Sequence, residues 1–192
     1  MDEKNTPKKY SIAEYKSLEV NEPLAKYEYY DGNVFNMAGG TYEHNLIISN
    51  TLFSLRVALG KKSPCKVLTS DMKVEIKEYN SYVYPDILVF CGQHTNTGMI
   101  KDSISNPKLI VEVLSDSTEL NDRKGKFSYY KSLPSFEEYI LIRQKPALID
   151  TYFRDENDMW VIGGVQKIED NLHLRSLDIS IPMEDIYEGV SF

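Results

Sequence analysis

Two short apolar runs dominate the pattern of hydrophobic and polar positions along the chain. Residues 84–90 and 108–114 are rich in aliphatic side chains, many of them β-branched, which is typical of strands buried in a central sheet. Each run nevertheless contains one acidic residue, Asp86 in the first and Glu112 in the second. A buried carboxylate loses solvation unless it is paired, so we expect both side chains to meet a shared partner.

Alternating apolar and polar positions predict further strands. A hairpin is expected over residues 27–37, with its turn at Asp31-Gly32-Asn33, because Asp-Gly tolerates a positive φ. Residues 65–76 are expected to form one strand, in which apolar side chains alternate with Lys73 and Glu75. In the second half of the chain, strands are expected over residues 138–143, 147–154, 159–166 and 177–181.

Helical patterns are confined to three segments. Residues 12–17 follow Ser11, which forms a capping box with Glu14. Residues 44–59 repeat apolar side chains at three- and four-residue steps, and Gly60 ends that helix. A third helix is expected over about residues 122–132. Strands and helices in this order predict an α/β (α+β) fold, in which a mixed central sheet is flanked by a few helices.

Composition favours one domain. A chain of 192 residues with 42% hydrophobic content can bury a sizeable core, so we expect a single domain over residues 1–192, with residues 1–9 loose. Two cysteines are too few for a disulfide framework, and neither a signal peptide nor a membrane-spanning run occurs. We therefore expect a soluble cytoplasmic protein. A net charge of −7 disfavours non-specific coating of nucleic acid but allows a local basic groove.

The two strand carboxylates indicate a metal site. Mg²⁺ prefers hard carboxylate oxygens and is usually held by one or two carboxylates together with water and substrate phosphate. Asp86 and Glu112 on neighbouring strands match that requirement, which favours metal-dependent cleavage of a phosphodiester. The alternative is a buried ion-pair cluster that has only a structural role.

The chain resembles a known family at several motifs. They are Tyr27-Glu28-Tyr29-Tyr30-Asp31-Gly32, Glu43-His44-Asn45 at a helix start, Tyr84-Pro85-Asp86, Val111-Glu112-Val113-Leu114-Ser115 with Thr118, and residues 122–126 with Tyr130. In order and spacing they are similar to the Uma-type family of restriction endonucleases, within the PD-(D/E)XK nuclease superfamily. The resemblance covers about residues 10–150 and implies a restriction-endonuclease-like fold.

The resemblance implies a set of site residues. Glu28, Asp86 and Glu112 would be the acidic set, and Lys126 the lysine. Asp86, Glu112 and the backbone carbonyl of Val113 would hold Mg²⁺, with Mn²⁺ as a substitute. The superfamily pattern places its lysine two positions after the glutamate, where this chain has Leu114. In this family Lys126 takes its place from the following helix, and Leu114 is expected to face the core.

Other residues are weaker candidates. His44 could reach into the site, although a structural role at the helix start is favoured. Tyr130 is interpreted mainly as a core anchor with a solvated hydroxyl. Lys124 and Arg123 could contact a phosphate or belong to a solvated helix face, and Asp122 could be a helix N-cap.

Three classes of function remain open. The leading one is a Mg²⁺-dependent endodeoxyribonuclease that acts on double-stranded DNA. The second is a nuclease-fold module that binds DNA or a protein without cutting. The third is a transposon-associated or scaffold protein that uses the fold for assembly alone. Aromatic residues in the later strands, Tyr139, Tyr152, Phe153 and Trp160, favour a homodimer, as does the need of restriction-type nucleases to cut two strands.

Overall fold

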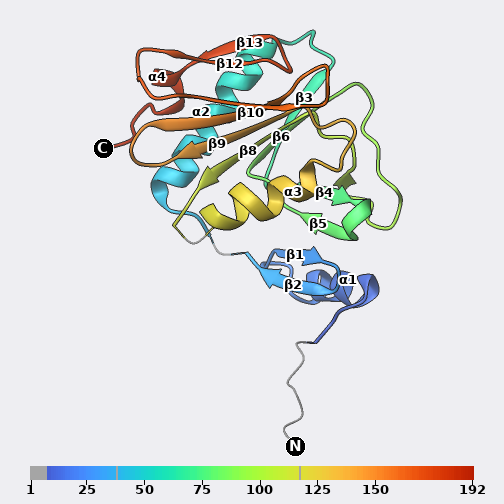
Figure 1. Ribbon diagram of the computed structural model, residues 1–192. Coiled ribbons are helices and arrows are strands. Elements are labelled where there is room, and N and C mark those ends of the chain that lie inside the picture. Colours follow the sequence, from blue (N-terminus) through green and yellow to red (C-terminus); the bar gives the residue numbers. More distant parts are fainter. Residues whose placement is uncertain (1–7, 38, 117) are drawn as a thin grey trace, which may run out of the picture.

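The computed structural model describes residues 8–37, 39–116 and 118–192 and has a mixed α+β fold (Figure 1). The expectation of a loose N-terminus falls mostly on residues 1–7, outside the described part. The elements are α1 (Ile12–Asn21), β1 (Tyr27–Tyr30), β2 (Asn33–Asn36), α2 (Tyr42–Leu59), β3 (Cys65–Thr69), β4 (Lys73–Ile76), η1 (Lys77–Tyr79), β5 (Ser81–Val83), β6 (Ile87–Cys91), β7 (Ser103–Ile104), β8 (Leu109–Leu114), η2 (Asn121–Lys126), α3 (Phe127–Tyr130), β9 (Glu138–Arg143), β10 (Leu148–Arg154), β11 (Trp160–Val165), β12 (Asn171–Leu174), β13 (Ile179–Pro182) and α4 (Met183–Ile186).

The two apolar runs form the middle of a six-stranded sheet. Its strand order is β11-β10-β9-β8-β6-β3, and β8 pairs parallel to β9 while the other neighbours are antiparallel. This is the mixed sheet that the pattern predicts. All six side chains of β8 are buried, as expected for a strand covered on both faces.

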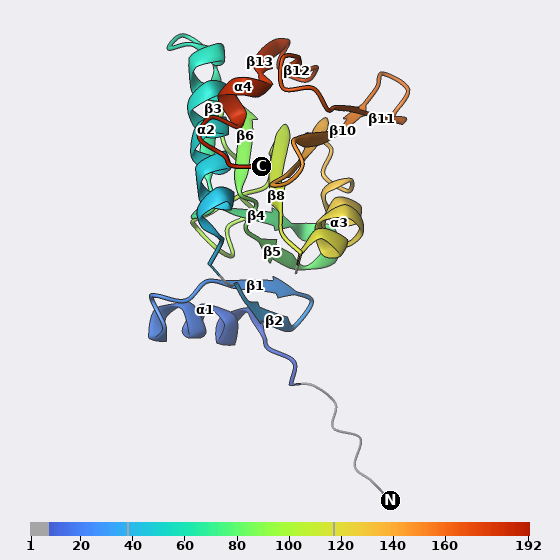
Figure 2. The same ribbon diagram turned by 90° about the vertical axis from the view of Figure 1, so that its left-hand side faces the viewer.

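A second sheet lies below the first in Figures 1 and 2 and has the order β2-β1-β5-β4-β7. The prediction of one strand over residues 65–76 is therefore wrong, because β3 belongs to the first sheet and β4 to the second. Both faces of β4 are covered, so Lys73 and Glu75 are buried, contrary to their expected exposure. Each has a partner: Lys73 pairs with Glu19 at 2.9 Å, and Glu75 accepts a hydrogen bond from Tyr82 at 2.8 Å.

Alternation along β8 divides the core of the six-stranded sheet. Leu109, Val111 and Val113 pack on the face covered by α2, α4 and the small β12–β13 sheet. Ile110 and Leu114 pack on the opposite face, with Tyr130 of α3 and side chains of β4 and β5. Glu112 belongs to this second set because side chains two positions apart share a face. Leu114 is 4% exposed, so its predicted place in the apolar core is confirmed.

Predictions that depend on residues close in sequence are confirmed for the hairpin turn and the helix caps. Asp31 and Gly32 have positive φ and close the β1–β2 hairpin. The Ser11–Glu14 capping box is present, although α1 continues to Asn21. Helix α2 begins at Tyr42 with Thr41 as its N-cap and ends at Gly60. None of the helices in the described ranges is long and apolar enough to cross a membrane.

The aromatic residues of the later strands pack within the chain. Phe127 stacks on Tyr139 at 5.4 Å between ring centroids and also contacts Tyr152 and Trp160. Tyr139 is fully buried. These aromatic side chains therefore have partners within the chain, and the homodimer stays a prediction.

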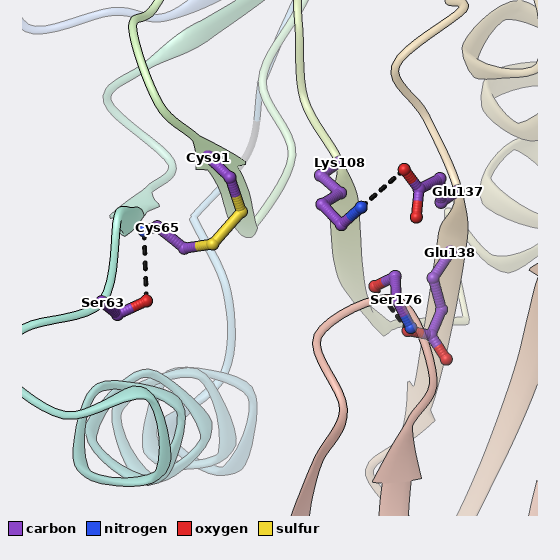
Figure 3. Close-up of a disulfide and its surroundings, with 7 residues drawn as sticks. All are labelled: Ser63, Cys65, Cys91, Lys108, Glu137, Glu138 and Ser176. Carbon is purple, nitrogen blue, oxygen red and sulfur yellow. Dashed lines mark hydrogen bonds and ion pairs between the residues drawn. A yellow bond between two sulfur atoms is a disulfide. The ribbon is translucent and has the colours of Figure 1, made fainter.

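Cys65 and Cys91 face each other on β3 and β6 and form a disulfide (Figure 3). The cysteine count does not predict this bond. A single cross-strand bond needs only two facing positions, and the register of β3 against β6 provides them.

Glu138 connects the six-stranded sheet to the β12–β13 loop (Figure 3). Its carboxylate, 1% exposed, accepts hydrogen bonds from the backbone N–H of Arg175 at 3.0 Å and of Ser176 at 2.9 Å, and from the Ser176 hydroxyl at 2.7 Å. The neighbouring Glu137 makes a half-exposed ion pair with Lys108 at 2.5 Å.

We predict that Glu138→Gln lowers the free energy of unfolding by about 1–3 kcal/mol, because an amide NH₂ would face a buried donor. Glu137→Gln is the matched control and should cost less than about 1 kcal/mol. Urea unfolding followed by circular dichroism measures both. Equal losses would mean that the Glu138 contacts contribute no more than a surface ion pair.

Candidate functional site

Four side chains proposed from the sequence converge where the two sheets meet. Glu28 comes from β1 of the lower sheet, Asp86 immediately precedes β6, Glu112 lies in β8, and Lys126 ends η2. Lys126 Nζ lies 3.2 Å from Glu28 Oε1 and 3.2 Å from Glu112 Oε1. The chain thus brings together residues that are far apart in the sequence.

The register of β6 against β8 brings Asp86 and Glu112 together. Ile87 pairs with Val111, so Asp86 comes opposite Glu112. The backbone N–H of Asp86 donates to Glu112 Oε2 at 3.2 Å, and the backbone N–H of Val113 donates to Asp86 Oδ2 at 2.7 Å. Each carboxylate is therefore held by the backbone of the other strand.

Lys126 is the buried cation of the cluster. It is 6% exposed, and its third carboxylate partner is Asp122, with Oδ1 at 3.4 Å. Residues 121–126 form a π-helical turn rather than the expected regular helix. Such turns are uncommon and occur frequently at functional sites. This turn carries both Asp122 and Lys126 into the interior.

Carboxylates outnumber basic side chains in the cluster. Three carboxylates, from Glu28, Glu112 and Asp122, contact Lys126, and Asp86 lies against Glu112. Burial raises the pKa of Glu112 well above its usual value, and the neighbouring carboxylates add to this effect while Lys126 opposes it. Burial alone would lower the pKa of Lys126, but Glu112, Glu28 and Asp122 hold it well above its ordinary value. Lys126 is therefore a cation held by the carboxylates around it.

Two tyrosine hydroxyls donate hydrogen bonds to carboxylates of the cluster. The Tyr130 hydroxyl donates to Glu112 Oε1 at 3.1 Å, and that of Tyr30 donates to Glu28 Oε2 at 2.8 Å. Tyr130 is fully buried, so the expectation of a solvated hydroxyl is wrong. A further bond to Glu28 Oε1 comes from the backbone N–H of Tyr84 at 3.0 Å.

His44, for which the sequence favours a structural role at the helix start, also reaches the cluster. Its Nε2 lies 3.3 Å from Asp86 Oδ2, and its position follows from the N-terminus of α2, where Thr41 accepts a hydrogen bond from the His44 N–H. A Cβ at Gly40 would lie 2.4 Å from His44 Nδ1, so this imidazole position requires a glycine there.

Burial alone would lower the pKa of His44, but the hydrogen bond and charge of Asp86, together with the backbone of Val113, raise it above its ordinary value. The imidazole therefore responds to the same carboxylate and strand backbone that form the centre of the cluster.

Of three neighbouring residues, Lys124 fits the expected solvated helix face, whereas Arg123 and Asp122 differ from their expected roles. Lys124 is exposed and lies outside the cluster. Arg123 is engaged by Glu119 at 2.7 Å and Asp150 at 2.6 Å, rather than being free for a phosphate. Asp122 is a member of the cluster and not a helix cap. Its position four residues before Lys126 is the sequence signal that could have identified it.

Asp86 carries the most exposed carboxylate of the cluster. Asp86 Oδ1 accepts no hydrogen bond from the described residues, and the side chain is 15% exposed. Together with Glu112 and the Val113 carbonyl it offers two carboxylates and one neutral oxygen, which is as much protein ligation as Mg²⁺ usually has. Within the described ranges, no three His, Cys, Asp or Glu side chains form a group that could hold a metal. The excess of carboxylates over basic side chains also favours a cation.

The fold is shared with a solved structure. A crystal structure from Anabaena variabilis, described as a "putative nuclease belonging to DUF820", superposes with a TM-score of 0.74 over 95% of this chain and 99% of that one, at 15% identity. Residues 12–184 match the Uma2 family model, "Putative restriction endonuclease", and the chain belongs to that family. Two uncharacterized proteins of Synechocystis sp. are similar over most of their length. The protein slr1290 is 34% identical, and the match covers 96% of this chain and 94% of slr1290. The protein sll1609 is 31% identical, and the match covers 82% of this chain and 88% of sll1609.

We predict that His44 stabilises the fold in a pH-dependent way. Its folded-state pKa is raised above the ordinary 6.5, so its contribution is fully present below that pH and is lost as the pH rises through the folded-state value. The difference in unfolding free energy between the native protein and His44→Gln should therefore shrink as the pH rises above the ordinary value of 6.5. Urea unfolding in EDTA measures it. A difference that is constant or grows with pH would contradict the ion pair with Asp86.

Proposed function

We propose that the protein is a Mg²⁺-dependent endonuclease that hydrolyses DNA phosphodiester bonds. The observation that carries this proposal is the contact of Glu28 and Glu112 with Lys126, together with the position of Asp86 opposite Glu112. Membership of a family described as restriction endonucleases supports DNA as the substrate. The leading substrate is double-stranded DNA, cut by a homodimer with one site for each strand.

The proposed metal ligands are Asp86, Glu112 and the backbone carbonyl of Val113. A bound Mg²⁺, or Mn²⁺ in its place, lowers the pKa of a coordinated water and polarises a phosphoryl oxygen. The protein's contribution is to fix the oxygens. Backbone N–H groups from the opposite strand hold one oxygen of each carboxylate, so the donor set is in place before substrate arrives.

Lys126 is proposed to neutralise negative charge that grows on the phosphate or to orient the attacking water. Its Nζ contacts the same Glu112 carboxylate that would bind the metal. Only the Glu112 side chain would therefore separate Lys126 from the metal. Glu28 orients Lys126 and can accept a proton through water. His44 faces Asp86 from the more open side, where a DNA phosphate would approach.

The second candidate is a nuclease-fold module that binds DNA without cutting it. A protein of a mobile element could have this role. The second candidate is favoured by the three carboxylates that already engage Lys126, since a lysine held in this way could be a purely structural cation.

We predict that Asp86→Asn reduces Mg²⁺-dependent nicking of supercoiled plasmid by at least about 100-fold, because it removes a ligand charge and keeps an oxygen for the Val113 N–H. Asp102→Asn, at an exposed position, is the control and should leave nicking unchanged. Calorimetric titration with Mg²⁺ and Mn²⁺ measures metal binding separately. A native protein that retards duplex DNA in gels but cleaves neither DNA nor RNA with either metal would support the second candidate.

The lysine is tested by a pair of substitutions. Lys126→Met should lower turnover by about 100- to 1,000-fold with little change in metal affinity, since it removes charge stabilisation used mainly in the transition state. Lys124→Met, on the exposed side of the same turn, should change little. Because Lys126→Met also leaves three buried carboxylates without their cation, circular dichroism must first show that it is folded. Equal loss of turnover in both variants, or loss in Lys124→Met alone, would show that Lys126 does not have the proposed role.

A further inference from the structure

The edge strand β11 is unusually open to pairing. It ends the six-stranded sheet, and among the described residues it pairs only with β10. Its sequence, Trp160-Val161-Ile162-Gly163-Gly164-Val165, contains no charge, and Ile162 is 70% exposed. Sheet edges are normally protected by charged side chains, prolines or bulges. The opposite edge, β3, has an exposed lysine, Lys66, and a disulfide to its neighbour, so only β11 lacks such protection in this sheet.

The hydrogen-bond pattern shows which backbone groups of β11 face outward. Arg154 donates its N–H to Glu137, so even-numbered residues of β10 bond to β9. Asp155 donates to Met159, so odd-numbered residues of β10 bond to β11. Bonding pairs alternate along an antiparallel ladder. The N–H and C=O groups of Trp160, Ile162 and Gly164 therefore point away from the sheet.

The sequence of β11 is self-complementary about Ile162. The two residues before it, Trp160 and Val161, are large, and the two after it are glycines. In an antiparallel pair of two β11 strands centred on Ile162, Trp160 of one copy comes opposite Gly164 of the other, and Val161 opposite Gly163. Large side chains then cover glycines across the new ladder, an arrangement that stabilises sheet edges.

Charge and exposed apolar surface beside the strand agree with this register. Exposed Lys167 has no ion-pair partner among the described residues, and the register carries it to the acidic β10–β11 turn of the other copy, which contains Glu156 and Asp158. Met159, 65% exposed, comes opposite Val165. We propose that two copies of this chain associate through β11 as antiparallel neighbours about a two-fold axis at Ile162, so that two six-stranded sheets become one.

This arrangement uses a surface separate from the charged cluster. Two strands, β9 and β10, lie between β8 and the edge, so the side chains around Asp86 stay uncovered. The proposal does not rest on nuclease activity. Six residues from each copy form a smaller contact than a standard stable interface, so we expect a dissociation constant in the micromolar range.

Sedimentation velocity of the 192-residue chain tests the proposal. The protein concentration runs from about 5 to about 200 μM, a range chosen around a micromolar dissociation constant. The native protein should form dimers as its concentration rises, and Ile162→Lys should remain monomeric because a lysine at the centre of the edge opposes its own copy. Phe53→Lys is the matched control: Phe53 is also 70% exposed but lies on α2, and this variant should still dimerise. A monomeric native protein at the highest concentration, or a dimeric Ile162→Lys, would overturn the proposal.

Crosslinking tests the register itself. Both native cysteines are already joined, so Ile162→Cys adds a lone thiol. Directly opposite residues in a bonded antiparallel pair have Cα atoms about 5.5 Å apart, which suits a disulfide. Mild oxidation should convert most of Ile162→Cys into a covalent dimer on non-reducing gels, and much less of Phe53→Cys. Equal crosslinking of the two variants, or none at position 162 in a protein that sediments as a dimer, would exclude this pairing.

Discussion

The buried ammonium of Lys126 is the interaction on which the arrangement of the chain depends. It contacts Glu28 from the lower sheet, Glu112 from the upper sheet and Asp122 from its own turn. None of the four side chains is more than 9% exposed, so each depends on the others for the electrostatic stabilisation that water would otherwise provide. The cluster therefore links both sheets and the π-helical turn at one point, as well as forming the candidate site.

A purely structural ion-pair cluster would be expected to approach neutrality. This one holds more carboxylates than basic side chains, because Asp86 and Glu112 lie opposite each other and the four carboxylates share only Lys126 and His44. Burial and the neighbouring carboxylates raise the pKa of Glu112. Such an arrangement costs stability unless a further cation is present. The excess of carboxylates over basic side chains is the physical reason for preferring a metal-binding interpretation of the cluster over a purely structural one. Asp86 and His44 form the partly exposed end of the cluster.

The upper sheet has two features that serve different purposes. Its middle strands are covered on both faces and hold charged groups in fixed positions, whereas its β11 edge exposes backbone donors and acceptors on a strand with no charged residue. The rigid centre suits a preorganised site, and the open edge suits association with a second copy. Because β9 and β10 separate them, the two can act independently.

The sequence alone determined what depends on near neighbours: the hairpin at Asp31-Gly32, the capped helices, the two apolar strands and the acidic residues within them. Motif order also pointed to Glu28 and Lys126. Only the tertiary structure decided the register that sets Asp86 opposite Glu112, the division of residues 65–76 between two sheets, the Cys65–Cys91 bond and the inclusion of Asp122, Tyr130 and His44 in the cluster. These features join segments far apart in the chain, or depend on which face of a turn is buried, and local patterns contain no information about either.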